Sequence, residues 1–327
     1  MKYYLLFDYP FDKNEFISKK SSFPLEKVGP STGKKGGKLK CWLSGVYNVI
    51  KRSNRGDVIV CNFDFLAVLL YWFCLLAFKK REIFAINIML KSRPTLKNWV
   101  VTQMYKVALK SKHFHASVTS TKYGEWLNQT KGMNVKYSVI RDVCRKGYLQ
   151  FTKGKCATSN TIFCGGKNGR DWGFMVELAK TLPQFTFTIV TNDSVYRKIK
   201  GDVPSNVKLY HSIPLNTFMD LLLSSEVVCL PLDTEAPAGL IVVFETATCK
   251  KPLFITETVT SCEYVNETTG YPLPRDVYEW KRALEYGFAH RGEMQAKAEK
   301  MFDFITKECS EDNFVKQLDI MIGNFVK

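Results

Sequence analysis

The chain has 327 residues, of which 46% are hydrophobic and 24% are charged. This composition excludes a disordered tail protein, a collagen-like fibre and a small disulfide-stabilised scaffold, and the length is sufficient for two ordinary domains. Residues 1–150 carry 27 basic and 9 acidic side chains, a net charge of +18, whereas residues 151–327 carry 20 and 22, a net charge of −2. We therefore expect the first half to face an anionic partner.

Short apolar runs alternate with longer helical patterns through the first half of the chain. This alternation predicts a parallel sheet with crossover helices. The predicted strands are Tyr3–Phe7, Val58–Asn62, Ile83–Ile88, Ala116–Val118 and Val135–Ile140, and the predicted helices are Leu39–Arg52, Phe65–Phe78, Leu96–Lys110 and Lys122–Gln129.

The second half repeats the pattern and ends in helices from Arg275 onward. The predicted fold is therefore α/β, with two Rossmann-like domains at residues 1–148 and 149–327 and with the terminal helices in the second. Its predicted strands are Thr161–Cys164, Phe185–Val190, Val207–Tyr210, Val227–Leu230, Pro252–Ile255 and Gly270–Pro272, and its predicted helices are Trp172–Leu182, Asp193–Ile199, Leu215–Ser225 and Val242–Thr248.

The segment Phe65–Phe78 consists of apolar residues only and is followed at once by Lys79, Lys80 and Arg81. It is too short to cross a membrane, which takes about 20 such residues. One interpretation is a buried crossover helix. The other is a helix that lies in a membrane surface, with the cations binding anionic headgroups. Both can hold on different faces of one helix.

The ten cysteines are spread singly, without the close spacing of a zinc site or a redox motif. The N-terminal apolar run ends at Asp8 and is too short for a signal peptide. We therefore expect reduced thiols and a cytoplasmic protein.

A glycine-containing loop follows the predicted strand that ends at Cys164. Gly165 and Gly166 permit unusual backbone torsions, Lys167 and Arg170 supply positive charge, and a helix opens near Asp171. Backbone N–H groups at a helix start favour an anion, and an arginine binds phosphate oxygens bidentately. The same kind of turn also occurs in proteins that bind no ligand there.

A second loop, residues 231–239, leads into an apolar helix that starts near Gly239 and Leu240 and carries Glu245. A carboxylate on a buried helix is unfavourable unless something pairs with it. Glu245 is either a solvated residue on an exposed face or a group that faces a binding site, and its apolar neighbours Leu240–Phe244 favour a buried helix and the second interpretation. In the second case it is suited to accept hydrogen bonds from a ribose diol, and the amides at the helix start are suited to a diphosphate.

The order GG-x-x-x-RD, then AG-x-x-x-x-x-E-x-A-x-x-x-KP, resembles the C-terminal domain of GT-B glycosyltransferases, in particular the retaining family-4 group (glycosyl transferases group 1). The similarity covers residues 158–260, and the first half shares only the pattern. It implies two Rossmann-like domains that face each other across a cleft. Carried over by position, the donor-binding residues are Gly165, Gly166, Lys167, Arg170, Gly239, Leu240 and Glu245.

In this family a further glutamate precedes the ribose-binding acid and touches the donor sugar. Here Pro237 stands near that position and Glu235 lies two residues before it. Either Glu235 substitutes after a shift of the loop, or the role is absent. On the first interpretation, Glu235 and Arg170 are the candidate catalytic residues.

The resemblance implies a transferase that moves a sugar from a nucleotide-diphosphate sugar, with UDP the expected nucleotide, and that retains the anomeric configuration. No Asp-x-Asp motif of metal-dependent enzymes occurs, so we expect no metal and no cofactor besides the nucleotide-sugar co-substrate.

The positive first half suggests a lipid-linked saccharide acceptor on an anionic membrane, hence a peripheral protein of the inner face of the plasma membrane in polysaccharide or glycoconjugate synthesis. One alternative is a non-catalytic partner subunit of a glycosyltransferase. Another is a nucleic-acid-binding protein, although the chain has no recognised nucleic-acid-binding motif and we expect no nucleic-acid partner.

Overall fold

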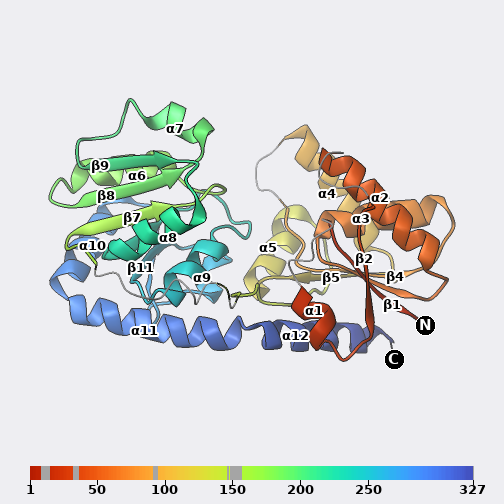
Figure 1. The fold of residues 1–327 in the computed structure, drawn as a ribbon. Helices are drawn as coiled ribbons and strands as arrows, with labels where there is room; N and C mark the ends of the chain where they lie inside the picture. The colour runs from red at the N-terminus through yellow and green to blue at the C-terminus, as the bar shows by residue number, and fades with distance from the viewer. Residues whose placement is uncertain (9–14, 32–36, 91–94, 146, 148–156, 327) are drawn as a thin grey trace. The chain divides into compact units, whose positions relative to one another are not determined.

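The computed structural model describes residues 1–8, 15–31, 37–90, 95–145, 147 and 157–326. The chain forms two compact units (Figure 1). The first consists of Met1–Val143 together with Glu311–Lys327, and the second consists of Cys144–Ser310. Each unit is a parallel sheet between layers of helices, as the sequence predicted.

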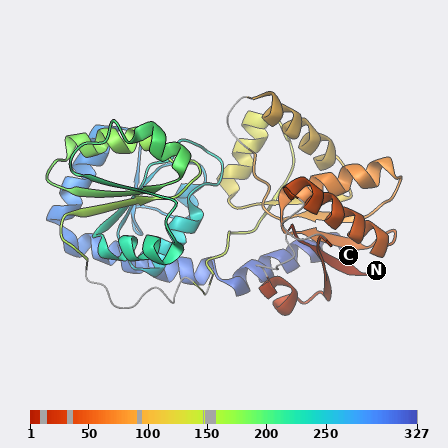
Figure 2. The same cartoon turned by 45° about the horizontal axis from the view of Figure 1, so that its top comes forward.

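The first unit has six parallel strands in the order β2-β1-β3-β4-β5-β6. One face of this sheet packs against α1 and α12 through a shared apolar core, and α2, α3 and α4 lie on the other face (Figure 2). Its elements are β1 (Tyr3–Leu6), α1 (Glu15–Lys20), β2 (Leu25–Val28), α2 (Gly37–Arg52), β3 (Val58–Cys61), α3 (Asp64–Leu76), β4 (Glu82–Ala85), α4 (Leu96–Leu109), β5 (Phe114–Val118), α5 (Thr121–Lys131), β6 (Ser138–Val139) and α12 (Glu311–Val326).

The second unit has six parallel strands in the order β12-β11-β10-β7-β8-β9. The helices α8 and α9 share one core with α11, and α6 and α10 belong to the core on the opposite face. Its elements are β7 (Thr161–Gly165), α6 (Trp172–Thr181), β8 (Thr186–Thr191), α7 (Asp193–Ile199), β9 (Val207–His211), α8 (Leu215–Ser224), β10 (Val227–Leu230), α9 (Leu240–Thr248), β11 (Leu253–Thr256), β12 (Tyr271–Leu273), α10 (Val277–Ala289) and α11 (Arg291–Glu308).

The C-terminal helix α12 differs from the prediction, which placed all terminal helices in the second domain. Phe314, Leu318 and Met321 of α12 are buried in the same cluster as Val60 and Phe84 of the first sheet. The amphipathic pattern of this helix showed that it buries one face, but it contained no information about which sheet receives that face. The predicted boundary between residues 148 and 149 lies outside the described residues.

The apolar segment after residue 64 is the crossover helix α3, which buries Leu66, Val68 and Leu70 and ends in two exposed leucines, at 75 and 76. Within the part of the chain that the structure describes, no helix combines the length and the hydropathy of a membrane-spanning segment. The interpretation as a buried crossover helix is therefore confirmed for the body of α3, whereas contact of its exposed end with a membrane stays a prediction.

Candidate functional site

The candidate site lies where the strand order of the second sheet reverses. The first strand of this unit, β7, lies between β8 on one side and β10 on the other. The loops that follow β7 and β10 therefore leave the same edge of the sheet next to each other and lead to helices on opposite faces. In open α/β sheets, ligands bind in the crevice that forms at such a reversal. Both glycine-containing loops that the sequence singled out begin at this point.

These two loops are hydrogen-bonded to each other by their backbones. The amide of Asp171 donates to the carbonyl of Pro231 (3.0 Å), and the amide of Asp233 donates to the carbonyl of Gly169 (3.2 Å). Arg170 and Leu232 form an isolated antiparallel bridge between them. The loops after β7 and β10 are therefore one preorganised unit.

Arg170 is the centre of this arrangement. Its side chain is buried, with the residue 6% exposed, and its Nε and Nη1 groups donate to the carbonyl oxygens of Gly165 (3.0 Å) and Asn168 (3.1 Å). Burial lowers the pKa of the guanidinium, but an arginine stays protonated at neutral pH. The carboxyl groups of Glu245 and Asp233 act in the opposite direction. A buried positive charge with N–H groups to spare is suited to hold an anion.

Two glycines leave the space that the guanidinium occupies. A Cβ on Gly166 would lie 2.6 Å from Nη2 of Arg170, and a Cβ on Gly239 would lie 3.2 Å from Nη1. Both residues also have positive φ angles, +129° and +85°. Glycine is required at each position by the backbone and, at Gly166, also by the close approach of the arginine.

Glu245 lies on α9 and is 4% exposed. Among the residues that the structure describes, none donates a hydrogen bond to its carboxyl group. Burial raises the pKa of Glu245 to about 7, and the positive charge of Arg170 lowers it only in part. Buried carboxyl groups are normally paired, so a carboxyl group without a hydrogen-bond donor indicates a binding partner from outside the fold.

The amino end of α9 supplies further donors. Its N-cap is Gly239, which provides no side-chain hydrogen bond to the first turn. The first amides of a helix have no partner within the helix, so those at Leu240 and the next residue are available to an anion.

The amino end of α6 differs from our expectation for it. The carboxylate of Asp171 accepts a hydrogen bond from the amide of Phe174 (3.1 Å) and one from Nε of Arg275 (2.6 Å). This N-cap already supplies the negative charge that the helix terminus favours. Of the groups in the two loops, Arg170 and the start of α9 therefore remain the candidates for holding an anion.

The remaining predicted residues lie in these same loops. Lys167 is exposed beside Gly166. Glu235, in the loop after β10, accepts a hydrogen bond from the amide of Val259 through Oε2 (2.8 Å), and its own carbonyl accepts one from Thr260. This contact ties the loop to the segment after β11, a role that the sequence did not suggest. The structure leaves the predicted catalytic role of Glu235 untested.

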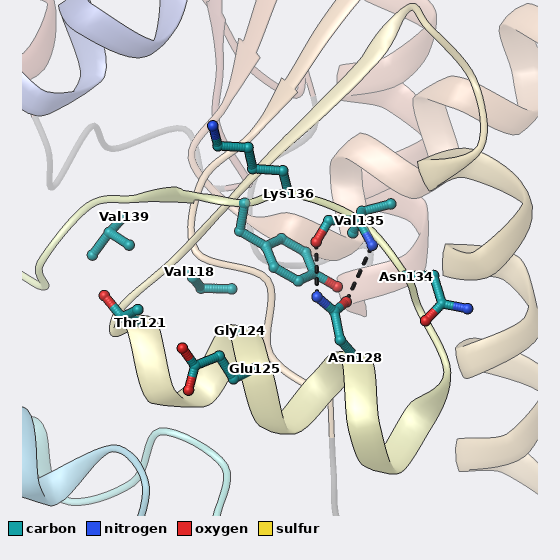
Figure 3. A pocket seen from close by; sticks show the side chains of 10 residues that line it. Val118, Thr121, Gly124, Glu125, Asn128, Asn134, Val135, Lys136 and Val139 are labelled. Atoms are coloured by element: carbon teal, nitrogen blue, oxygen red, sulfur yellow. Dashed lines mark hydrogen bonds between the residues drawn. The ribbon is translucent and has the colours of Figure 1, made fainter.

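Two further features of the structure concern groups outside these loops. Within the described residues, no three side chains of metal-ligand type cluster together. A pocket of about 370 Å³ lies in the first unit, beside α5, and is lined by Val118, Gly124, Asn128 and Val135 among others (Figure 3). The Asn128 amide hydrogen-bonds both backbone groups of Val135, which fixes one wall. None of the predicted site residues lines this pocket.

The raised pKa of Glu245 predicts a pH-dependent stability. Between pH 4.5 and about 7 the folded state holds a proton that the unfolded state releases, so the free energy of unfolding falls as the pH rises. The Glu245→Gln variant has no such titration. We expect the two proteins to unfold alike near pH 4.5, and the variant to be more stable by about 3 kcal/mol at pH 8. Urea unfolding across this range measures the difference, and equal curves at pH 8 would contradict it.

No known protein family and no curated protein matches the sequence. Several solved structures match the fold. HepE of Anabaena, solved with UDP, is 14% identical over 99% of this chain and 100% of its own, with a TM-score of 0.68. Sucrose-phosphate synthase of Thermosynechococcus elongatus is 13% identical over 98% and 88%, with a TM-score of 0.71.

A glycosyltransferase of Rickettsia africae is 12% identical over 100% and 99% of the two chains, with a TM-score of 0.66. These similarities extend over nearly the whole chain and include both six-stranded sheets. The chain therefore has the GT-B fold of glycosyltransferases.

Proposed function

We propose that the protein is a glycosyltransferase that transfers a sugar from a nucleotide-diphosphate sugar, with UDP as the nucleotide. The observation that carries this proposal is the buried carboxyl group of Glu245, which receives no hydrogen bond from the described residues and lies near the cation of Arg170. The fold supports the proposal, since HepE, which shares it, was solved with UDP and with UDP-glucose.

In the proposed complex, the hydroxyl groups of the nucleotide ribose donate hydrogen bonds to Glu245, and the diphosphate binds Arg170 and the first amides of α9. The carbonyl of Gly165 and the space beside Gly166 hold the guanidinium in place for the diphosphate, and Lys167 adds an exposed positive charge. The ribose would then provide the donors that the Glu245 carboxyl group lacks within the protein.

In the proposed reaction, the bond between the anomeric carbon of the sugar and the diphosphate breaks, and negative charge develops on the leaving diphosphate. The oxygen of an acceptor hydroxyl bonds to the anomeric carbon, and its proton passes to the diphosphate. Arg170 and the helix amides stabilise the charge on the diphosphate from positions that the fold has already fixed. Glu235, whose Oε2 is held by the amide of Val259, contacts the donor sugar through its other oxygen. Retention of configuration and independence from a metal or an additional cofactor are parts of this proposal.

The acceptor is proposed to bind the first unit. The positive charge of the first half supports an anionic acceptor, which we propose to be a lipid-linked saccharide in the synthesis of a surface polysaccharide or glycoconjugate. The protein would then work as a peripheral protein on the inner face of the plasma membrane, where such lipids and anionic headgroups occur together.

Thermal unfolding with UDP, GDP, ADP and CDP tests the donor site directly. A nucleotide at about one hundred times its dissociation constant should stabilise the protein by about 2.7 kcal/mol. We expect UDP to do so and the other three to act weakly. Transfer from a panel of UDP-sugars then distinguishes an enzyme from a subunit that binds the donor without turning it over. A folded protein that responds to none of the four nucleotides would refute the donor site.

A further inference from the structure

The end of α3 exposes apolar side chains that the fold does not use. Every residue from Leu75 to Lys80 is exposed, and this segment (LLAFKK) is called the α3 tip below. Phe78 is 95% exposed and Leu76 is 74% exposed. A single exposed leucine is ordinary, but consecutive large apolar side chains beside two lysines are typical of an interaction surface.

Phe78 also has a backbone conformation that is unfavourable for phenylalanine. It lies just after the C-cap Ala77 with a φ of +53°. Its amide donates to the carbonyl of Leu75 (3.2 Å), and the amide of Lys79 donates to the carbonyl of Cys74 (2.8 Å). These two bonds form a Schellman motif, whose left-handed position is usually taken by glycine. A bulky residue there is a rare choice. The stability of the fold does not explain why phenylalanine occupies this position. The exposed ring therefore indicates a binding partner outside the chain.

The charges around the tip indicate the chemistry of that partner. Residues 37–112 contain fourteen lysines and arginines but only three carboxylates. Asp57 and Asp64 are buried, and the carboxylate of Glu82 is bonded to His113 and His115. The positive charge of this segment is therefore not offset by an exposed, unpaired carboxylate within it.

Several of these cations lie at the same edge of the sheet as the tip. The amide of Gly56 donates to the carbonyl of Lys80 (3.3 Å), which places the exposed Arg55 next to the tip. The helices α3 and α4 follow neighbouring parallel strands and run in the same direction, so Lys110, just after α4, reaches this edge as well. Apolar side chains surrounded by cations complement an anionic lipid bilayer, with the acyl region below and the headgroups around it.

We propose that the α3 tip binds anionic phospholipid membranes, with Leu76 and Phe78 inserted among the lipids and Lys79 and Lys80 at the headgroups. This inference rests on the proposed function, since it locates the membrane partner named there. A second copy of the chain is a less suitable partner for the α3 tip, because a symmetric contact between two tips would bring the same cations together.

Sedimentation with phosphatidylcholine vesicles, with and without phosphatidylglycerol, tests the proposal on the full chain. We expect binding only to the anionic vesicles, and weaker binding at high salt. Phe78→Gly should bind on the order of tenfold more weakly because it removes the inserted ring. At the same time its melting temperature should stay equal or rise, because glycine suits the positive φ angle. The double variant Lys79→Gln, Lys80→Gln should lose on the order of thirtyfold.

A matched pair of variants controls for nonspecific adsorption of exposed apolar side chains to the vesicles. Leu76 and Tyr278 are each 74% exposed, and Tyr278 lies on α10 in the second unit. Leu76→Ser should weaken vesicle binding, and Tyr278→Ser should not. Equal effects of the two substitutions would overturn the proposal, as would wild-type affinity in Phe78→Gly or a failure of the wild type to bind anionic vesicles. A loss of self-association in Phe78→Gly without a change in vesicle binding would assign the tip to a protein contact instead.

The nucleotide response of the same samples separates this inference from the proposed function. If UDP stabilises the protein but the protein does not bind vesicles, the donor site is supported and the membrane contact of the α3 tip is refuted. A protein that binds anionic vesicles through the tip but responds to no nucleotide has the membrane surface without the proposed activity.

Discussion

The Glu245→Ala substitution should abolish the stabilisation that UDP gives the protein, while the variant itself stays folded. The ribose diol loses its only proposed carboxylate acceptor, and each hydrogen bond to a charged group contributes about 1.5–3 kcal/mol. Two such bonds correspond to a loss of affinity of at least about a hundredfold. At about one hundred times the wild-type dissociation constant, the stabilisation by UDP should therefore fall from about 2.7 to about 0.4 kcal/mol or less, which nearly removes the melting shift.

Two further variants test whether this loss is specific to the carboxylate of Glu245. Glu245→Gln keeps the shape of the side chain but can accept through one oxygen only, so it should retain part of the response. Glu285→Ala removes an exposed glutamate from α10 in the same unit and should respond like the wild type. If Glu245→Ala bound UDP with unchanged affinity, Glu245 would be a buried residue without a ligand, and the donor site would have to lie elsewhere.

The sequence predicted the position of this site because its loops follow strands. The ends of β7 and β10 could be read from short apolar runs, and the reversal of strand order brings the loops after them together. The apolar neighbours of Glu245 correctly indicated a buried carboxylate, at 4% exposure. Side-chain geometry could not be predicted in the same way. That Asp171 caps α6 through Phe174, and that Glu235 holds Val259, depends on rotamers and on contacts between segments distant in sequence.

The elements that the sequence missed are short or charged. The strand β2 has only four residues, two of them charged, and lies at the edge of its sheet. Charged side chains on edge strands discourage pairing with other chains and also hide the apolar pattern of a strand. The helix α1 has six residues, too few to show helical periodicity. It is stabilised by tertiary contact with α12 at the other end of the chain, including ion pairs from Lys20 to Glu311 and Asp312.

Of these substitutions, Arg170→Ala is expected to have the largest effect, because it lowers the stability of the two loops and also lowers the rate of sugar transfer. The carbonyl groups of Gly165 and Asn168 would lose their donors, and each buried group left without a partner costs about 1–3 kcal/mol. The same substitution removes the cation proposed to stabilise the leaving diphosphate, which should lower the transfer rate by on the order of 10²–10³-fold. Without the positive charge, the pKa of Glu245 should also rise further.

The chemical part of this effect can be separated from the structural part. Arg170→Lys keeps the charge, but a single ammonium cannot reproduce the planar fork that reaches both carbonyls and an anion, so transfer should still fall steeply. Gly166→Ala leaves the arginine in the sequence and places a methyl group 2.6 Å from Nη2 of Arg170, which forces the guanidinium to move, and it also strains the backbone at a φ of +129°.

If Arg170 acts by its position, Gly166→Ala should lose transfer by a similar factor, while Arg197→Ala, which removes an exposed arginine from α7, should lose none. The decisive quantity is kcat at saturating donor, measured at a temperature where all four variants are folded. Wild-type kcat in Arg170→Ala under those conditions would mean that the cation maintains the loops and takes no part in the chemistry.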